Sequence, residues 1–101
     1  MMVIGAGHIT VEPEKRESYL AGCVSIVKRA RSLAGCLDFA ITADLVDPSR
    51  VNIFERGESQ AALESARSSA PPFEQAEAML SVSVADYDVA DVRPLFGEST
   101  A

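Results

Sequence analysis

The sequence predicts one α+β domain in which two helices cover the same face of an antiparallel sheet. Its 101 residues suit a single domain. Four stretches alternate apolar and polar residues, as half-buried strands do, and two others have the spacing of amphipathic helices. Their order is β-α-β-β-α-β, which is the ferredoxin-like arrangement. We expect the core over residues 3–87 and a C-terminal arm over residues 88–101 that could lie on another subunit.

The first strand is predicted from Val3 to Val11, and both of these residues share one face with Ile9. Gly5 and Gly7 lie on that same face. Glycine inside a strand often marks a place where another group comes close to the backbone. The two glycines therefore leave a trough on the core side, which bulky helix residues could fill or a ligand could occupy.

The first helix follows at Pro13, because proline suits the first turn, where its missing N–H costs nothing. Gly35 suits the left-handed residue just past the end of a helix. Acidic residues near the start and basic residues near the end complement the helix dipole. The apolar residues between them form one stripe that we expect to face the sheet: Tyr19, Leu20, Cys23, Val24, Ile26, Val27, Ala30 and Leu33.

A hairpin follows the first helix. Leu37, Phe39 and Ile41 alternate with polar or small residues and form the expected core face of its first strand. Residues 47–50, Asp-Pro-Ser-Arg, predict the turn, because proline fixes φ at the second position and aspartate suits the first. The return strand over residues 51–54 is rich in β-branched and aromatic side chains.

Ser59 predicts the N-cap of the second helix. We expect this helix to continue to about Ala70, where a Pro-Pro pair stops it. Residues 73–79 could add another helical turn or two. The last strand is predicted over residues 80–87, because leucine and valine alternate there with serine and alanine.

The two faces of the predicted sheet differ in polarity. One face is aliphatic and should take the helices; its residues are Val3, Ile9, Leu37, Phe39, Ile41, Val51, Ile53, Val82 and Val84. The other face mixes polar groups with apolar ones and is too apolar to be left wholly in water. We therefore predict a homodimer in which the sheets stack through the face that carries His8, Thr42, Asn52 and Phe54.

The composition excludes several classes of partner. The net charge of −6 and the pI of about 4.6 argue against binding to nucleic acid or to an anionic membrane. No apolar run approaches the roughly 18 residues of a membrane span, and the first residues lack a basic leader, so we expect a cytoplasmic protein. Cys23 and Cys36 are then expected as thiols, although a disulfide stays an alternative. One histidine and no close cysteine pair predict no metal site.

Several short motifs occur in an order that is typical of one family. They are Val11-Glu12-Pro13-Glu14 before the first helix, Gly35-Cys36-Leu37 at the second strand, Asp47-Pro48 in the turn, Phe54-Glu55-Arg56 at the end of the third strand and Ala61-Ala62-Leu63 in the second helix. With them the chain resembles, over residues 3–87, the antibiotic biosynthesis monooxygenase or quinol monooxygenase-like family of the dimeric α+β barrel superfamily.

The resemblance implies oxidation of phenols or quinols by O₂ without a bound cofactor. A deprotonated, electron-rich aromatic substrate can reduce O₂ itself, while the pocket orients it and excludes water. Three departures from the family pattern occur: Gly57 stands where a tryptophan is frequent, Ala66 where a histidine is frequent, and Pro71-Pro72 where a second histidine commonly precedes the phenylalanine matched by Phe73. The small residues Gly7, Gly57 and Ala66 could enlarge a cavity for a planar ligand, or they could reflect loss of activity.

We expect the substrate cavity between the sheet and the helices, lined by Gly5, Gly7, Tyr19, Cys23, Phe39, Phe73 and Met79. Some of these residues, Cys23 and the phenylalanines among them, could equally be ordinary core. The catalytic candidates are Tyr19 and His8. Tyr19 could donate a hydrogen bond to a phenolic oxygen or only pack with its hydroxyl at the rim.

Three titratable side chains have a structural alternative. His8 titrates near neutrality, but alternation directs it away from the helices, where packing in a dimer interface is the alternative to catalysis. Glu55 and Glu58 are interpreted as caps or surface charges at a strand-to-helix corner rather than as an acid–base pair.

The sequence therefore supports two hypotheses of different class. The first is a dimeric, cofactor-independent monooxygenase that oxidises an aromatic, quinol or polyketide-type small molecule with O₂. The second is a non-catalytic module on the same scaffold that binds a hydrophobic small molecule or is associated with stress. Uptake of O₂ with a panel of quinols discriminates between them.

Overall fold

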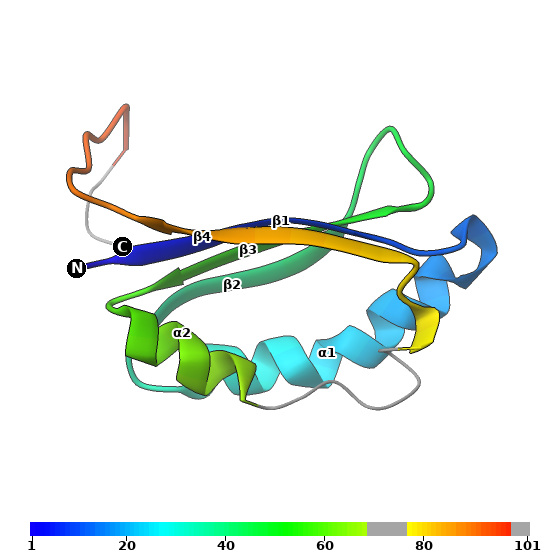
Figure 1. Cartoon of the computed structure of the whole chain (residues 1–101), viewed down its shortest axis with the longest axis horizontal. Coiled ribbons are helices and arrows are strands. Elements are labelled where there is room, and N and C mark those ends of the chain that lie inside the picture. The colour runs from blue at the N-terminus through cyan, green and yellow to red at the C-terminus, as the bar shows by residue number, and fades with distance from the viewer. Residues whose placement is uncertain (69–76, 98–101) are drawn as a thin grey trace.

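A computed structural model describes residues 1–68 and 77–97 of the chain. Four strands form one antiparallel sheet in the order β2-β3-β1-β4: β1 (Val3–Thr10), β2 (Cys36–Ala43), β3 (Arg50–Gly57) and β4 (Ser81–Asp88). A short 3₁₀ turn, η1 (Pro13–Lys15), leads into helix α1 (Arg16–Ser32), and helix α2 (Gln60–Arg67) follows β3. Both helices lie on one side of the sheet (Figure 1). The predicted ferredoxin-like arrangement is confirmed.

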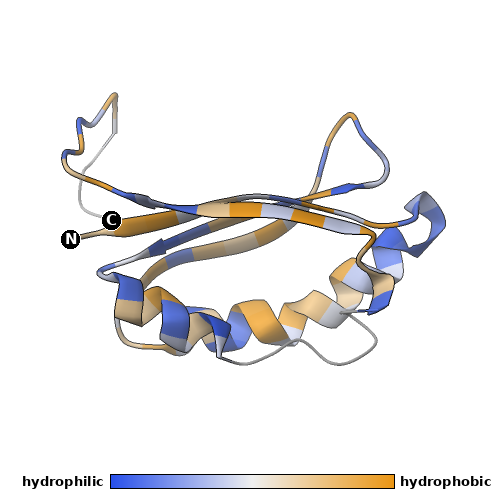
Figure 2. Ribbon diagram, in the orientation of Figure 1, coloured by the Kyte–Doolittle hydropathy of each residue, from blue (hydrophilic) through white to orange (hydrophobic). Residues whose placement is uncertain are grey.

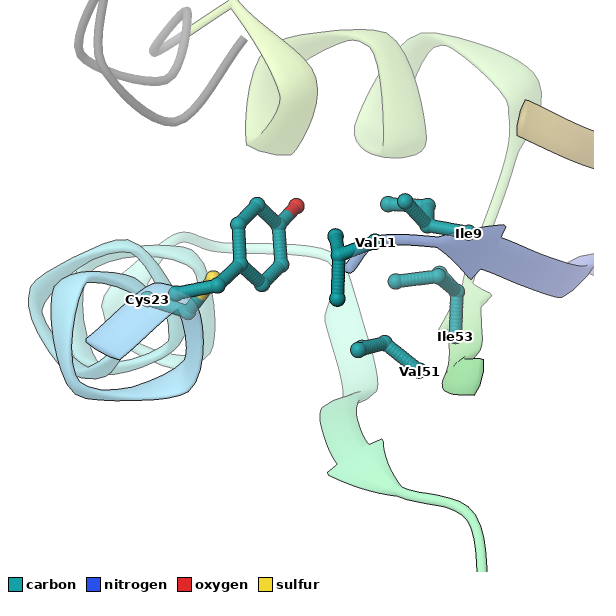
Figure 3. Packing of buried hydrophobic residues seen from close by; sticks show 6 residues of the cluster. Ile9, Val11, Cys23, Val51 and Ile53 are labelled. Atoms are coloured by element: carbon teal, nitrogen blue, oxygen red, sulfur yellow. The ribbon is translucent and has the colours of Figure 1, made fainter. Parts of the chain in front are cut away.

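The core lies between the sheet and helix α1. Figure 3 shows the side chains of Ile9, Val11, Val51 and Ile53 projecting from the sheet toward the helix that carries Cys23. All five are at most 8% exposed. The hydropathy colouring shows the matching pattern on α1, which begins polar and is apolar along its middle (Figure 2). This side of the sheet is called the covered face below.

The predicted helix-capping residues are found in the structure, while two other features of the helices differ from the prediction. Gly35 has φ +84, a left-handed conformation that glycine adopts without strain, and the hydroxyl of Ser59 caps α2 by accepting from the N–H of Ala62 at 3.1 Å. Helix α2 ends at Arg67, earlier than the predicted Ala70. Val24, predicted in the buried stripe of α1, is 51% exposed and therefore does not belong to it.

Leu37 corrects the predicted core face of β2. The register of β2 against β3 shifts between Cys36 and Asp38, so that Leu37 is the extra residue of a bulge. The alternation therefore breaks there: Cys36 packs against the core cluster around Phe39, while Leu37 is 43% exposed. A strand pattern read from sequence continues through a bulge unnoticed, because the bulge leaves no mark in the apolar spacing.

The edge strand β4 is exposed along its whole length. Its register pairs Val82 with Ile9 and Val84 with Gly7, which places both valines on the covered face as predicted. They are nevertheless 58% and 37% exposed.

The opposite side of the sheet, called the bare face below, has no helix on it (Figure 1). The registers place on it the residues paired with His8, which are Asn52 of β3 and Ser83 of β4. Phe54 and Tyr87 also lie there and are 39% and 56% exposed. The β2–β3 turn and the residues after β4 both rise on this side of the sheet (Figure 1). In the part of the chain that the structure describes, no helix is both long and apolar enough to cross a membrane.

Candidate functional site

A partly open cavity of about 180 Å³ lies between the covered face and the two helices. Its described lining comes from every layer of the fold: Ile9 of β1, Phe39 and Ile41 of β2, Tyr19, Cys23 and Ile26 of α1, Ala66 and Arg67 of α2, and Met79 just before β4. This lining is aliphatic, aromatic or sulfur-bearing except for the hydroxyl of Tyr19 and the guanidinium of Arg67. Such an apolar pocket with a few polar groups is the usual form of a small-molecule site.

The structure brings together four of the seven residues predicted to line the cavity: Tyr19, Cys23, Phe39 and Met79. Phe73 lies outside the described residues. Gly5 and Gly7 are not part of the described lining. The predicted trough over these two glycines is therefore not the cavity, and each glycine has a different neighbour that explains this.

The space over Gly5 holds three charged side chains. A Cβ built on Gly5 would overlap the guanidinium of Arg67 and come within 2.7 Å of Oε1 of Glu55. The carboxylate of Asp86 lies next to them, at 3.1 Å from the same point. Glycine is thus required at this position because the backbone of β1 is the floor beneath an ion cluster.

The space beside Gly7 holds backbone. A Cβ there would overlap the carbonyl oxygen of Ser83 and lie 2.7 Å from the Cα of Val84, both in the neighbouring strand β4. The space beside Gly57 is likewise filled, because the side chain of Leu63 lies 2.9 Å from where a Cβ on Gly57 would be. Of the small residues expected to open a cavity, Ala66 does line it, whereas Gly7 and Gly57 do not.

Tyr19 supplies the hydroxyl of the cavity and is 4% exposed. Burial, and to a smaller extent the neighbouring Cys23 thiol, raises the pKa of Tyr19 above its ordinary value. The phenol therefore stays protonated at neutral pH. It can donate a hydrogen bond but cannot serve as a base; its role as a donor to a substrate stays a prediction.

An ion cluster closes the α2 end of the site; it consists of Glu55, Arg67 and Asp86. Arg67 donates from Nε and Nη2 to Oε1 of Glu55, at 2.8 and 2.5 Å, and from Nη1 and Nη2 to the two carboxylate oxygens of Asp86, at 2.9 and 2.5 Å. Gln60 adds a further bond to Asp86 at 3.0 Å. The cluster thus ties α2 to β3 and β4, the strands on either side of β1.

The cluster has a formal charge of −1, because one guanidinium meets two carboxylates. Hydrogen bonds from Arg67, and then from Gln60, lower the pKa of Asp86 to about 2. The bonds to Asp86 and Glu55 also raise the pKa of Arg67, although its burial opposes them. Arg67 is the charged group among the described residues that line the cavity.

Sequence reasoning misjudged Glu55 and did not single out Arg67 or Asp86. Glu55 is 5% exposed, so its interpretation as a surface charge is wrong. The signal that could have found it is the alternation of β3, which puts Glu55 on the same face as Val51 and Ile53. A carboxylate on a core-facing position predicts a buried cationic partner.

His8 lies on the bare face, since it alternates with the cavity-lining Ile9. Within one chain it therefore does not reach the cavity. Glu58, the other carboxylate of the corner, is exposed, in accord with its interpretation as a surface charge. No group of three or more histidine, cysteine or acidic residues that could hold a metal ion occurs within residues 1–68 and 77–97.

Comparison with known proteins gives the chain a family. The family model described as "Antibiotic biosynthesis monooxygenase" matches residues 2–79. Among curated proteins, the uncharacterized protein sll1783 of Synechocystis sp. is 29% identical over 62 residues, which cover 61% of this chain and 42% of that protein. The chain thus spans less than half the length of the curated relative it matches.

Solved structures share the fold at low identity. Rv0793 from Mycobacterium tuberculosis is 20% identical with a TM-score of 0.77, and the match covers 93% of this chain and 100% of that one. A candidate antibiotic biosynthesis monooxygenase from Deinococcus radiodurans is 17% identical with a TM-score of 0.78, over 96% and 100% of the two chains. PA3566 from Pseudomonas aeruginosa reaches 24% and 0.70, over 88% and 94%. At these identities the likeness shows the fold alone.

Proposed function

The chain belongs to the antibiotic biosynthesis monooxygenase family, and from this membership together with its cavity we propose that it oxidises a small quinol or phenol with O₂ and without a bound cofactor. The observation that carries the proposal is the apolar cavity whose lining includes two residues with hydrogen-bonding side chains, Tyr19 and Arg67. Fold alone would not support a reaction.

The size of the cavity limits the substrate. A cavity of about 150 Å³ lined by aliphatic and aromatic residues is known to accommodate benzene, and the cavity here measures about 180 Å³. One aromatic ring with its hydroxyls therefore fits better than the fused rings of a polyketide. Among the substrate classes that the sequence suggested, the geometry favours the monocyclic quinol.

The chemistry asks little of the protein. One oxygen atom of O₂ enters the ring as a hydroxyl and the other leaves as water, while the quinol becomes a quinone, so the substrate supplies every electron. The apolar residues exclude water and hold the ring. Tyr19 donates a hydrogen bond to a ring oxygen, which stabilises negative charge that develops there as the ring is oxidised.

A homodimer through the bare face is part of the proposal. Its support is that Phe54 and Tyr87 are exposed there among small and polar residues, and that no helix of the described chain covers them. The residues after β4 rise beside this face (Figure 1) and expose Val92, Leu95 and Phe96, at 59%, 87% and 88%. We propose that this C-terminal arm contacts the second subunit.

Oxygen uptake with hydroquinone and its methylated homologues tests the reaction. We expect uptake above the buffer rate, and loss of most of it in Ala66→Leu, because the larger side chain occupies the cavity. The matched control is Ala61→Leu, which makes the same change at an exposed position of the same helix and should leave uptake unchanged. Tyr19→Phe should lower the rate more than it weakens binding, since the hydroxyl acts on developing charge.

The alternative is a non-catalytic binding module on the same scaffold. Gly57 and Ala66, which replace the frequent tryptophan and histidine of the family pattern, favour it. Binding of hydroquinone in the cavity without O₂ uptake would establish the binding module and refute the monooxygenase.

A further inference from the structure

The α2 end of the cavity is built around one fixed guanidinium. The four hydrogen bonds of Arg67 to Glu55 and Asp86 hold its plane in place. They leave one N–H on Nη1 outside the cluster, since a guanidinium offers one donor more than these bonds use. Because Arg67 also lines the cavity, the cluster borders the space that a ligand would fill.

The charge of the cluster decides which ligand group can accept a hydrogen bond from Arg67. An arginine with no acidic partner would attract a carboxylate and bind it through two parallel hydrogen bonds. Here two carboxylates already occupy that fork, and the cluster carries one net negative charge. A third carboxylate would meet like charges at short range in an apolar cavity, where charges are poorly screened. A neutral hydroxyl or carbonyl oxygen accepts the remaining N–H without that repulsion.

We propose that Glu55, Arg67 and Asp86 set the charge specificity of the cavity, so that it takes an aromatic ring bearing neutral hydroxyl or carbonyl groups and rejects a ring that bears a carboxylate. The inference rests on the proposed function only in that both concern the same cavity. It adds the requirement that the ring carry no charge, and it names the residues that impose this requirement.

The absence of a side chain at Gly5 is also required for this charge specificity. Any side chain at this position would displace Arg67 or Glu55 from the place where they meet. The selectivity therefore depends on a residue that touches neither the ligand nor the cavity.

The test compares two ligands of similar size on the whole chain. Hydroquinone is neutral, and 4-hydroxybenzoate carries a carboxylate at neutral pH. Dissociation constants for both come from ligand-observed NMR titration or calorimetry. We expect the native protein to bind hydroquinone at least about tenfold more tightly than 4-hydroxybenzoate, as one unscreened unit of charge at this range allows.

Two variants change the charge of the cluster and should shift that ratio. Asp86→Asn removes one negative charge and keeps an acceptor for Arg67, while Gln60→Lys places a cation beside Asp86 without touching Arg67. Each variant should reduce the preference for hydroquinone over 4-hydroxybenzoate severalfold, mainly by lowering the dissociation constant of 4-hydroxybenzoate. The matched control is Asp88→Asn, which makes the same change on the same strand outside the cluster and should leave the ratio as it is.

The outcomes separate this inference from the proposed reaction. Equal binding of the two ligands to the native protein, binding of neither, or a ratio that the two cluster variants do not move, would overturn the charge specificity. The reaction would still stand if hydroquinone is consumed with O₂. A ratio that shifts as expected without any O₂ uptake would instead support the specificity and refute the oxidation.

Discussion

The two faces of the sheet differ in what completes them. The covered face is completed within the chain: Val3, Val51 and Leu63 are at most 1% exposed beneath or within its helices. The bare face leaves Phe54 and Tyr87 in contact with solvent. Both faces come from the same four strands, so what separates them is the alternation of side chains and where the two helices dock.

The covered face is itself divided along β1. Near Ile9 this face is apolar and leaves a cavity, whereas over Gly5 charged side chains fill the space. The division shows why a site can lie here: packing by the aliphatic end holds the fold, and the ion cluster fixes a polar group at the edge of an apolar space.

Leu63→Ala should have the largest effect. The side chain of Leu63 extends from α2 to Gly57 of β3 and is fully buried. Truncation of such a side chain costs about 2–5 kcal/mol in the free energy of unfolding. Leu45→Ala, at a fully exposed position of the β2–β3 turn, should change it by less than about 0.5 kcal/mol. Denaturant unfolding of both variants measures the contrast, and equal costs would contradict the assignment of Leu63 to the core.

Gly5→Ala should cost about 1–3 kcal/mol, as small-to-large changes in filled space do, because the new methyl overlaps the ion cluster. The cost should fall in an Arg67→Ala background, where the overlapping guanidinium is gone. A double-mutant cycle by thermal unfolding measures this coupling. If Gly5→Ala were neutral, the space over β1 would be open, which is the ligand-trough alternative that the sequence left.

Phe54→Glu addresses the bare face. If this face forms the proposed dimer, a buried carboxylate should raise the dimer dissociation constant at least about tenfold, or about 1.4 kcal/mol. Val24→Glu, an apolar-to-acidic change at an exposed position of α1, should leave the dimer intact. Sedimentation velocity over a concentration series checks both, and a native chain that stays monomeric at the highest concentration would refute the dimer.

The smallest effect is a loss of stability in acid. Asp86 has its pKa lowered to about 2 in the folded state, against about 3.9 when unfolded. Its contribution to stability is therefore complete above about pH 4 and is lost as the pH falls from about 4 toward 2. Asp86→Asn should flatten the stability curve in that window, whereas Asp88→Asn should not. An unchanged slope in Asp86→Asn would show that the bond to Arg67 does not form in solution.

The elements of the fold could be predicted because their signals are local. The alternation of apolar and polar residues predicted the strands, and Ser59 and Gly35 predicted helix ends. Asp47 predicted the turn, and its backbone carbonyl accepts a hydrogen bond from the N–H of Arg50 at 3.2 Å. Leu37 was misplaced because a bulge inserts one residue without changing the apolar composition of the strand.

The site was harder to predict, since its polar half depends on contacts between distant residues. Tyr19, Cys23, Phe39 and Met79 were found because apolar stripes converge on one space. The ion cluster joins residues 12 and 19 positions apart in sequence. Its members meet only once the strand order and register are fixed. The sequence therefore did not reveal that charged side chains fill the space over Gly5.

Where hydroquinone binds decides whether the substrate site lies beneath the helices. In a methyl-observed NMR titration, we expect saturable shifts of the methyl groups of Ile9, Ile41 and Met79, which line the cavity. The methyl groups of Ile4 and Ala6, on the bare side of the same strand β1, should stay unshifted. Shifts confined to Ile4 and Ala6, or no saturation at any methyl, would contradict a substrate site beneath the helices.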